Sequence, residues 1–435
     1  MLAALRTNPA WRRLFAAQVI ALSGTGLATV ALGLLAWQIA GDAAGQVLGT
    51  ALAIKMIAYV TLSPIAAALT VHLPRKPLLV ALDLLRAAVV LLLPFVTQVW
   101  QVYVLIFVLQ AASAAFTPAF QALIPEVLPE EADYTRALSL SRLAYDLESL
   151  LSPMLAAALL TVVSFPVLFL GTVAGFLGSA LMVLRAPLPP RAPVPQRGIW
   201  DRTTRGLRLY LGTPRLRGLL AVNFAVAAAG AMVLVNTVVL VKSAFGLGEP
   251  QVALALAAFG GGSMAAALAL PRLLDRWPER PPMLGGPALM ALAVALGPLA
   301  TALPALMALW LLAGLGYGLA LTPGGRLLRR SGTRDDLAAL FAAHFALSHA
   351  CWLLTYPLAG WLGTAAGMPA TFLTLAALSL LGLVTALRLW PATETALLHA
   401  HEGLPADHPH LRDHGTPHAH GRRADALHPQ WPPAR

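Results

Sequence analysis

Charged residues are scarce in this chain of 435 residues. They make up 11% of it, whereas hydrophobic residues make up 58%. A typical soluble domain is about one quarter charged and about half apolar. A soluble protein of this composition would have too little polar surface to remain in solution. The composition therefore excludes a soluble globular protein and predicts an integral membrane protein.

Cysteine and lysine are also rare. Cys351 is the only cysteine, which excludes an intrachain disulfide and a metal site built from several cysteines. The lysines Lys55, Lys76 and Lys242 follow Ile, Arg and Val, so the Gly-Lys pair of a phosphate-binding P-loop is missing. No nucleophile and base stand at a recognisable catalytic spacing. We therefore expect no nucleotide-driven motor, no enzyme activity and no cofactor.

Long apolar runs fill most of the chain. A helix needs about 20 apolar residues to cross the bilayer core, and twelve such runs are predicted. They cover residues 13–40, 46–71, 78–97, 99–122, 137–163, 166–185, 217–241, 250–271, 283–302, 304–323, 337–363 and 368–390. The sequence thus predicts an all-α fold with twelve transmembrane helices.

Basic residues outnumber acidic ones, 30 to 19, but their positions argue against nucleic-acid binding. They are concentrated in alternate loops between the apolar runs, such as the loop with Arg75 and the loop with Arg276. Loops rich in Lys and Arg face the cytoplasm. We therefore expect a multi-pass protein of the cell membrane with both termini in the cytoplasm.

One long loop, residues 187–216, divides the chain. It begins Pro-rich and then becomes basic with apolar residues at helical spacing, which predicts a helix lying on the membrane surface. Residues 1–186 and 217–390 then form two six-helix halves, arranged as a parallel repeat. Residues 391–435 form a polar tail.

Eight of the 11 histidines lie in this tail. They are His399, His401, His408, His410, His414, His418, His420 and His428. Neutral imidazole binds nickel, cobalt, copper and zinc, and the repeated His-x-His spacing lets two rings reach one ion. The Pro, Gly and charged residues between the pairs argue against a folded domain. We expect a disordered, metal-binding tail; the alternative is a merely solvated polar tail.

Charged side chains within the apolar runs are candidates for the transport pathway, because each is costly in a bilayer unless it is paired. Arg142 and Asp146 are one helical turn apart and are predicted to pair. Glu148 lies on another face and is a candidate for proton coupling or cation binding. Lys55 is a possible counter-charge for Glu148 or Asp146, or it extends to the membrane surface. A purely structural ion pair is the alternative for Arg142 and Asp146.

The run at 337–363 contains two further histidines, His344 and His349. They are candidate metal ligands, although about 140° of helical rotation separates them, which excludes a simple two-histidine site on one helix. Packing histidines with a hydrogen-bond partner are the alternative. Uncharged candidates for a polar pathway lining are Gln18, Gln110, Asn223, Asn236 and Tyr317.

Several segments resemble the major facilitator superfamily. The loop PRLLDRWPERP keeps Asp275, Arg276 and Arg280 of that family's Gly-x-x-x-Asp-Arg-x-Gly-Arg-Arg signature, whereas AALTVHLPRKP has Val71 and His72 in place of the Asp-Arg pair. The segments LLVALDLLRA and FTPAFQALIPEVLP are similar to the exporter branch that includes siderophore and drug efflux proteins. The resemblance covers residues 1 to about 390 and implies a transporter fold.

A finer resemblance follows from two features together. The segment YTRALSLSRLAYDLESLLSP, combined with a His-rich tail, is similar to the nickel-resistance exporters. This implies proton-driven efflux of a divalent metal, nickel or cobalt, as the transported species. The rivals are an exporter of an organic compound, such as a siderophore or drug, with a metal-sensing tail, and a membrane-bound metal buffer that does not transport.

Overall fold

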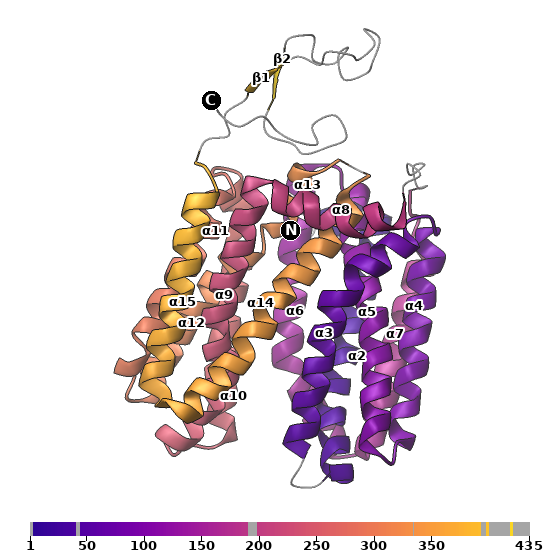
Figure 1. Ribbon diagram of the computed structural model, residues 1–435. Helices are drawn as coiled ribbons and strands as arrows, with labels where there is room; N and C mark the ends of the chain where they lie inside the picture. The colour runs from indigo at the N-terminus through magenta and orange to yellow at the C-terminus, as the bar shows by residue number, and fades with distance from the viewer. Residues whose placement is uncertain are drawn as a thin grey trace.

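The structure is a computed structural model that describes residues 3–40, 44–189, 198–333, 335–392, 397–399 and 418–420. Twelve long helices form its body (Figure 1). They are α2 (Pro9–Ala40), α3 (Ala44–Thr70), α4 (Arg75–Leu92), α5 (Val99–Val127), α6 (Glu131–Leu160), α7 (Phe165–Arg185), α9 (Pro214–Val239), α10 (Glu249–Leu274), α11 (Arg280–Ala295), α12 (Leu303–Leu321), α14 (Leu337–Ala365) and α15 (Gly367–Leu389). The predicted all-α membrane fold is confirmed.

Shorter elements extend or connect these helices. They are α1 (Ala3–Thr7), α8 (Ile199–Gly212), α13 (Gly324–Ser331), the 3-10 turns η2 (Leu93–Phe95) and η4 (Gly297–Leu299), and the π-helical turn η3 (Leu240–Ala244). Among the described residues, eleven helices are long and apolar enough to cross a membrane. The remaining long helix, α6, has 30 residues and completes the twelve. It begins at Glu131 rather than at the predicted residue 137. The prediction followed the apolar run, whereas the helix also includes charged turns that precede this run.

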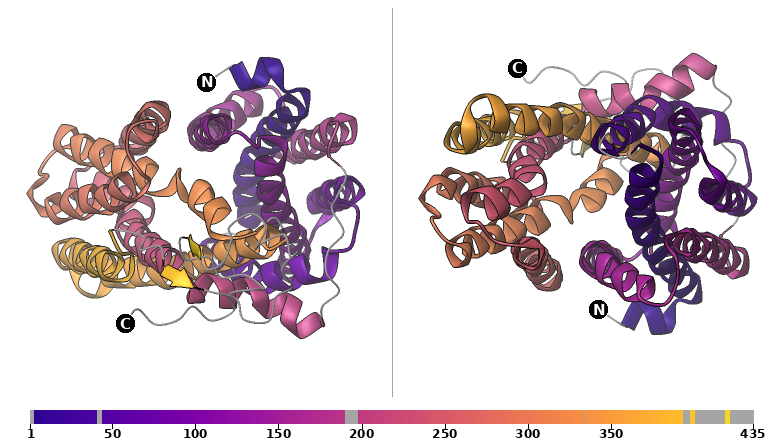
Figure 2. Two further views of the ribbon diagram at one scale, coloured as in Figure 1. Left: turned by 90° about the horizontal axis from the view of Figure 1, so that it is seen from above. Right: turned by 90° about the horizontal axis from the view of Figure 1, so that it is seen from below.

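The long helices form two halves, α2–α7 and α9–α15, which lie side by side (Figures 1 and 2). In the first half α2 and α4 both pack on α7; in the second half α10 packs on α12, and α9 packs on α15. Each half buries apolar clusters of its own, around Phe169 in the first and Trp310 in the second. This is the division into six and six helices that the sequence predicts.

Both α8 and α13 lie at one end of the bundle, where the two described ends of the chain also lie (Figure 1). We call it the terminal end. The predicted surface helix of the linker is α8, and it is tied to the second half by Arg205, whose Nε and Nη2 contact the Asp336 carboxylate at 2.5 and 3.0 Å. Gly206 permits close packing on α14, since a Cβ there would come within 2.1 Å of the Ala339 carbonyl oxygen.

The tail contains two short strands that the sequence does not predict. Strand β1 (Leu397–His399) pairs antiparallel with β2 (His418–His420), so that His399 is paired with His418. The other tail histidines, His401, His408, His410, His414 and His428, lie outside the described residues.

Candidate functional site

Helix α6 positions a buried ion pair where the two halves meet. Arg142 Nη2 and Nε contact the two Asp146 carboxylate oxygens at 2.5 and 3.2 Å, as the spacing of one turn predicts. Arg142 also reaches the other half: its Nε is 3.2 Å from Ser263 Oγ of α10, and its guanidinium lies 4.4 Å from the Tyr317 ring centroid of α12. The pair therefore also connects the halves.

Glu148 follows Arg142 on α6 by about 1.7 helical turns, and it faces α2. A Cβ added at Gly26 of α2 would come within 2.8 Å of Glu148 Oε1 and 1.9 Å of Ser152 Oγ, so the carboxylate is packed against the backbone of α2. Its electrostatic partner is Lys55 of α3, at a longer range than an ion pair. Of the two counter-charges expected for Lys55, Glu148 and Asp146, Glu148 is the one that the electrostatics favour.

Lys55 also belongs to an aromatic cluster between α3 and α14. Its Nζ is 5.7 Å from the Tyr59 ring centroid, and the Tyr59 ring meets His349 edge-on at 4.8 Å. The Phe345 ring lies 4.7 Å from Tyr59 and 4.2 Å from His349. Lys55 acts electrostatically on His349 as well. The charge of Lys55 thus acts on a carboxylate of the first half and on an imidazole of the second.

The His349 ring is fixed by one of its two nitrogens. His349 Nδ1 is 2.7 Å from the Phe345 carbonyl oxygen, which it contacts as a donor, so the other nitrogen, Nε2, is the one available for a ligand or proton. Tyr59 is fixed in turn, because its hydroxyl donates to Gln110 Oε1 at 2.8 Å. Glu148, Lys55 and His349 all lie near the middle of their helices.

The direct contacts of His344 are with the linker helix α8. Its Nδ1 is 3.1 Å from the Tyr210 hydroxyl of α8, and the two rings stack with centroids 5.9 Å apart. Burial raises the pKa of Tyr210 well above its usual value, with a further contribution from Cys351. The hydroxyl therefore stays protonated and can donate a hydrogen bond to His344 Nδ1. His344 therefore joins α14 to the linker helix, whereas His349 packs against Tyr59 of α3.

The remaining polar candidates have separate places. Gln18 Oε1 accepts from Ser141 Oγ at 2.9 Å and joins α2 to α6. Asn236 donates to the Ala359 carbonyl oxygen at 3.2 Å, and Asn223 to the Leu219 carbonyl oxygen at 2.8 Å. These three stabilise contacts within their own halves.

Arginines of α13, which the sequence did not single out, hold the halves together at the terminal end. Arg326 Nε forms ion pairs with Glu279 of its own half at 2.7 Å and with Glu131 of the other half at 2.5 Å. Arg329 lies 5.4 Å from the Tyr134 ring centroid and donates to the Pro129 carbonyl oxygen. The signal in the sequence was the run GGRLLRR, which reads equally well as an ordinary basic loop.

Contacts between α3 and α14 also join the two halves. Ser63 Oγ donates to the Ala342 carbonyl oxygen at 3.3 Å. The contacting residues are Tyr59 and Ser63 in α3, Arg142 in α6, and Ala342 and His349 in α14. Each lies between the middle of its helix and the terminal end. The structure thus represents a state in which the described contacts join the halves from the terminal end to about mid-helix.

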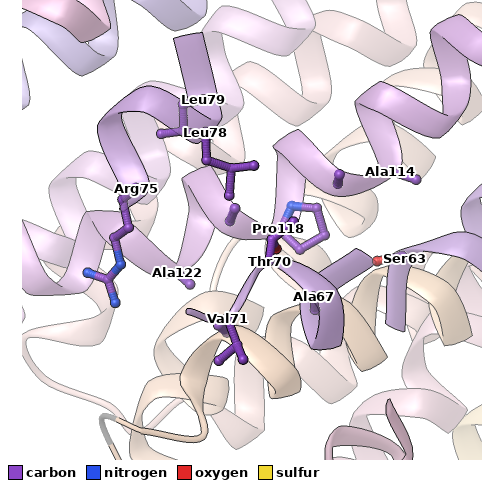
Figure 3. A pocket seen from close by; sticks show the side chains of 13 residues that line it. Ser63, Ala67, Thr70, Val71, Arg75, Leu78, Leu79, Ala114, Pro118 and Ala122 are labelled. Atoms are coloured by element: carbon purple, nitrogen blue, oxygen red, sulfur yellow. The ribbon is translucent and has the colours of Figure 1, made fainter. Parts of the chain in front are cut away.

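A small cavity lies beside these contacts, between α3, α4 and α5 (Figure 3). Its volume is about 30 Å³, and Ser63, Thr70 and Arg75 supply its polar lining. Such a space holds about one or two water molecules. Arg75 forms an ion pair with Glu126, which links the ends of α4 and α5. This cavity is too small for an organic substrate and is separate from the group around Glu148.

Comparison with known proteins identifies the family. The family model described as Major Facilitator Superfamily matches residues 14–240 and again residues 219–413. The chain belongs to this superfamily. No curated protein sequence matches it.

Solved structures agree with this assignment. A crystal structure of the human organic anion transporter MFSD10 (TETRAN) is 15% identical, with a TM-score of 0.75 over 87% of this chain and 99% of that chain. A bacterial homologue of the iron transporter ferroportin, in an outward-facing state, is 15% identical, with a TM-score of 0.73 over 87% and 99%. The same homologue with soaked iron is 14% identical, with a TM-score of 0.71 over 87% and 98%. At these identities the likeness shows a shared major facilitator fold, that of a multi-pass membrane transporter.

Metal ligands are not clustered in the transmembrane region. The described residues contain no group of three or more His, Cys, Asp or Glu side chains able to hold a metal ion together. A transmembrane metal site built by Glu148 and His349 therefore stays a prediction, as does metal binding by the tail histidines.

Proposed function

We propose that this major facilitator protein exports a divalent transition metal ion, nickel or cobalt, in exchange for protons. The observation that carries the proposal is the position of Lys55 near the middle of α3, where its charge acts both on Glu148 of the first half and on His349 of the second. Carboxylate and imidazole groups both bind these ions. A site with two protein ligands, completed by water, suits a cargo that must be released as well as bound.

In this mechanism Lys55 acts as a tethered cation. In the proposed cycle its ammonium compensates the Glu148 carboxylate when no metal is present. An arriving metal ion competes for that carboxylate and for His349, and a proton from the other side of the membrane later displaces the metal. Because only one cation at a time neutralises Glu148, metal and proton move in opposite directions as the halves rock about the site.

The orientation is part of the proposal. The terminal end, with its arginine-rich α13 and linker, is placed in the cytoplasm by the positive-inside rule. The tail would then concentrate metal at the cytoplasmic mouth through His399, His401, His408, His410, His414, His418, His420 and His428. Binding there raises the local supply of cargo but lies outside the membrane.

An organic substrate is the second candidate. It is favoured by the aromatic surroundings of the two cations: Tyr59 beside Lys55 and Tyr317 beside Arg142. Cations flanked by aromatic rings suit an organic anion with a flat apolar body.

Transport by the purified full chain in proteoliposomes separates these candidates. With an imposed pH gradient, we expect uptake of Ni²⁺ or Co²⁺ into vesicles that mimic export, and none of Mg²⁺, which prefers oxygen ligands and retains its water. Collapse of the gradient with an ionophore should stop the flux. Gradient-driven movement of an organic anion without any metal flux would instead establish the second candidate.

A further inference from the structure

An open groove lies on the surface of the first half, between α1 and the first turns of α2. Its volume is about 530 Å³, and α1 and α2 alone line it, through Leu5, Arg6, Arg12, Phe15, Ala16, Val19 and Ile20. The groove is basic at the terminal end and apolar along the rest of its length. It has no part in the site around Glu148.

The elbow that shapes this groove is fixed by Asn8. Its Oδ1 accepts from the Trp11 backbone N–H at 2.9 Å, which caps α2, and its Nδ2 donates to the Val127 carbonyl oxygen at 2.9 Å, which ties the elbow to α5. Trp11 is fully buried and its ring packs at a tilt against that of Phe15, with centroids 5.5 Å apart. The angle between α1 and α2 is therefore set by the fold.

The lining residues of α2 form a single stripe. Residues 12, 15, 16, 19 and 20 follow the spacing of one helix face, and about 12 Å of helix separates Arg12 from Ile20. The opposite face buries Leu14, Ala17 and Ala21 in the core of the first half. On this stripe Val19 is exposed, and Phe15, Ala16 and Ile20 are half-buried. We expect the uncovered part of these apolar side chains to face the membrane, over a length that reaches most of the way into one leaflet of about 15 Å.

Positive charge is concentrated at the outer end of the stripe. The side chains of Arg6 and Arg12 are both exposed, and no acidic residue is among those that line the groove. Arg13, next along the chain, has a different role, because it donates to the Arg185 carbonyl oxygen of α7. Two arginines at the outer end of an apolar groove suit a lipid with an anionic headgroup.

We propose that this groove binds an anionic phospholipid of the leaflet at the terminal end. The phosphate lies between Arg6 and Arg12, and one acyl chain follows Phe15, Val19 and Ile20. The inference does not depend on the transported substrate. It does explain why α1 is held at a fixed elbow above a membrane-facing surface.

The test is native mass spectrometry of the purified full chain, titrated with phosphatidylglycerol or phosphatidylcholine of identical acyl chains. We expect preferential binding of one phosphatidylglycerol and an affinity lowered by about 20- to 30-fold in the double variant Arg6→Gln, Arg12→Gln. The matched control Arg272→Gln, Arg276→Gln removes the same charge from exposed positions of the other half and should bind like the wild type. Val19→Trp, which fills the groove and keeps both arginines, should also weaken binding.

Three outcomes would overturn the proposal. They are equal binding of the two lipids by the wild type, an unchanged affinity in the Arg6 and Arg12 variant, and an equal loss in the Arg272 and Arg276 control. Free inorganic phosphate, added at roughly 1000-fold excess over the lipid, distinguishes a lipid site from a phosphate site. If it displaces the lipid, the headgroup phosphate alone is recognised.

Discussion

The ion pair between Glu131 and Arg326 predicts how strongly the terminal end is held closed. Glu131→Gln removes the charge that α6 of the first half contributes, and it leaves Arg326 paired with Glu279 in the second half. The Arg326 charge is not stranded, because its ion pair with Glu279 at 2.7 Å remains; the side chain of Glu131 itself is 43% exposed. The variant therefore tests the link between the halves without unfolding either of them.

The size of the effect follows from the exposure of the pair. Partly exposed ion pairs contribute about 0.5–1 kcal/mol, which changes an equilibrium by about two- to fivefold. The contacts of Arg326 with Thr135 at 3.2 Å and of Arg329 with Tyr134 remain. We therefore expect a shift of the population toward the state that is open at the terminal end, rather than complete opening.

Spin-label distance measurements can follow this shift. The only cysteine, Cys351, is buried and is replaced by alanine, and labels are placed at the exposed positions Val162 and Leu299 at the opposite end of the two halves. Opening of the terminal end should shorten the distance between the labels, since the halves rock as rigid bodies.

The control for this variant is Asp133→Asn. It removes the same charge two residues away, but Asp133 pairs with Arg136 of its own helix at 2.9 Å. Its distance distribution should match that of the wild type. An unchanged distribution in Glu131→Gln, or an equal shift in both variants, would refute the assignment of Glu131 as a link between the halves.

Four further predictions follow from other parts of the chain. Gly26→Ala should reduce transport at least about tenfold by displacing Ser152 and the neighbouring carboxylate, whereas Gly33→Ala on the same helix, where a Cβ meets nothing within 4 Å, should be silent in the same flux assay. Deletion of residues 399–435 should weaken metal resistance in a growth assay without abolishing it. Ni²⁺ binding by the full chain should fall when the tail histidines are replaced with alanine. It should also fall as the pH drops through about 6.5, because protonated imidazole cannot bind metal. A reporter fused after Arg435 should be active in the cytoplasm; activity only outside would reverse the orientation.

Local patterns in the sequence predicted much of the fold. The apolar runs gave the number of long helices, and the spacing of Arg142 and Asp146 predicted their ion pair, because both depend on residues near each other in the chain. The linker helix α8 was likewise visible in its helical spacing of apolar residues.

Contacts between distant segments could not be predicted in this way. The packing of Glu148 on Gly26 depends on how α6 packs on α2. The position of Lys55 and the different ring partners of His344 and His349 depend on how helices distant in the sequence pack together. The ion pairs of Arg326 are of the same kind, since no pattern in one loop shows which carboxylates lie across an interface. The helical rotation did show that the two histidines could not share a face, but not that His344 contacts Tyr210.

The central claim is that Glu148 couples metal export to proton entry. Its most direct test is the initial rate of Ni²⁺ flux in proteoliposomes with an imposed pH gradient, for the wild type, Glu148→Gln and Glu148→Asp. We predict that Glu148→Gln inserts normally but loses gradient-driven flux, and that Glu148→Asp, which keeps the carboxylate, retains part of it. Wild-type flux in Glu148→Gln would contradict the account and leave this carboxylate a structural role only.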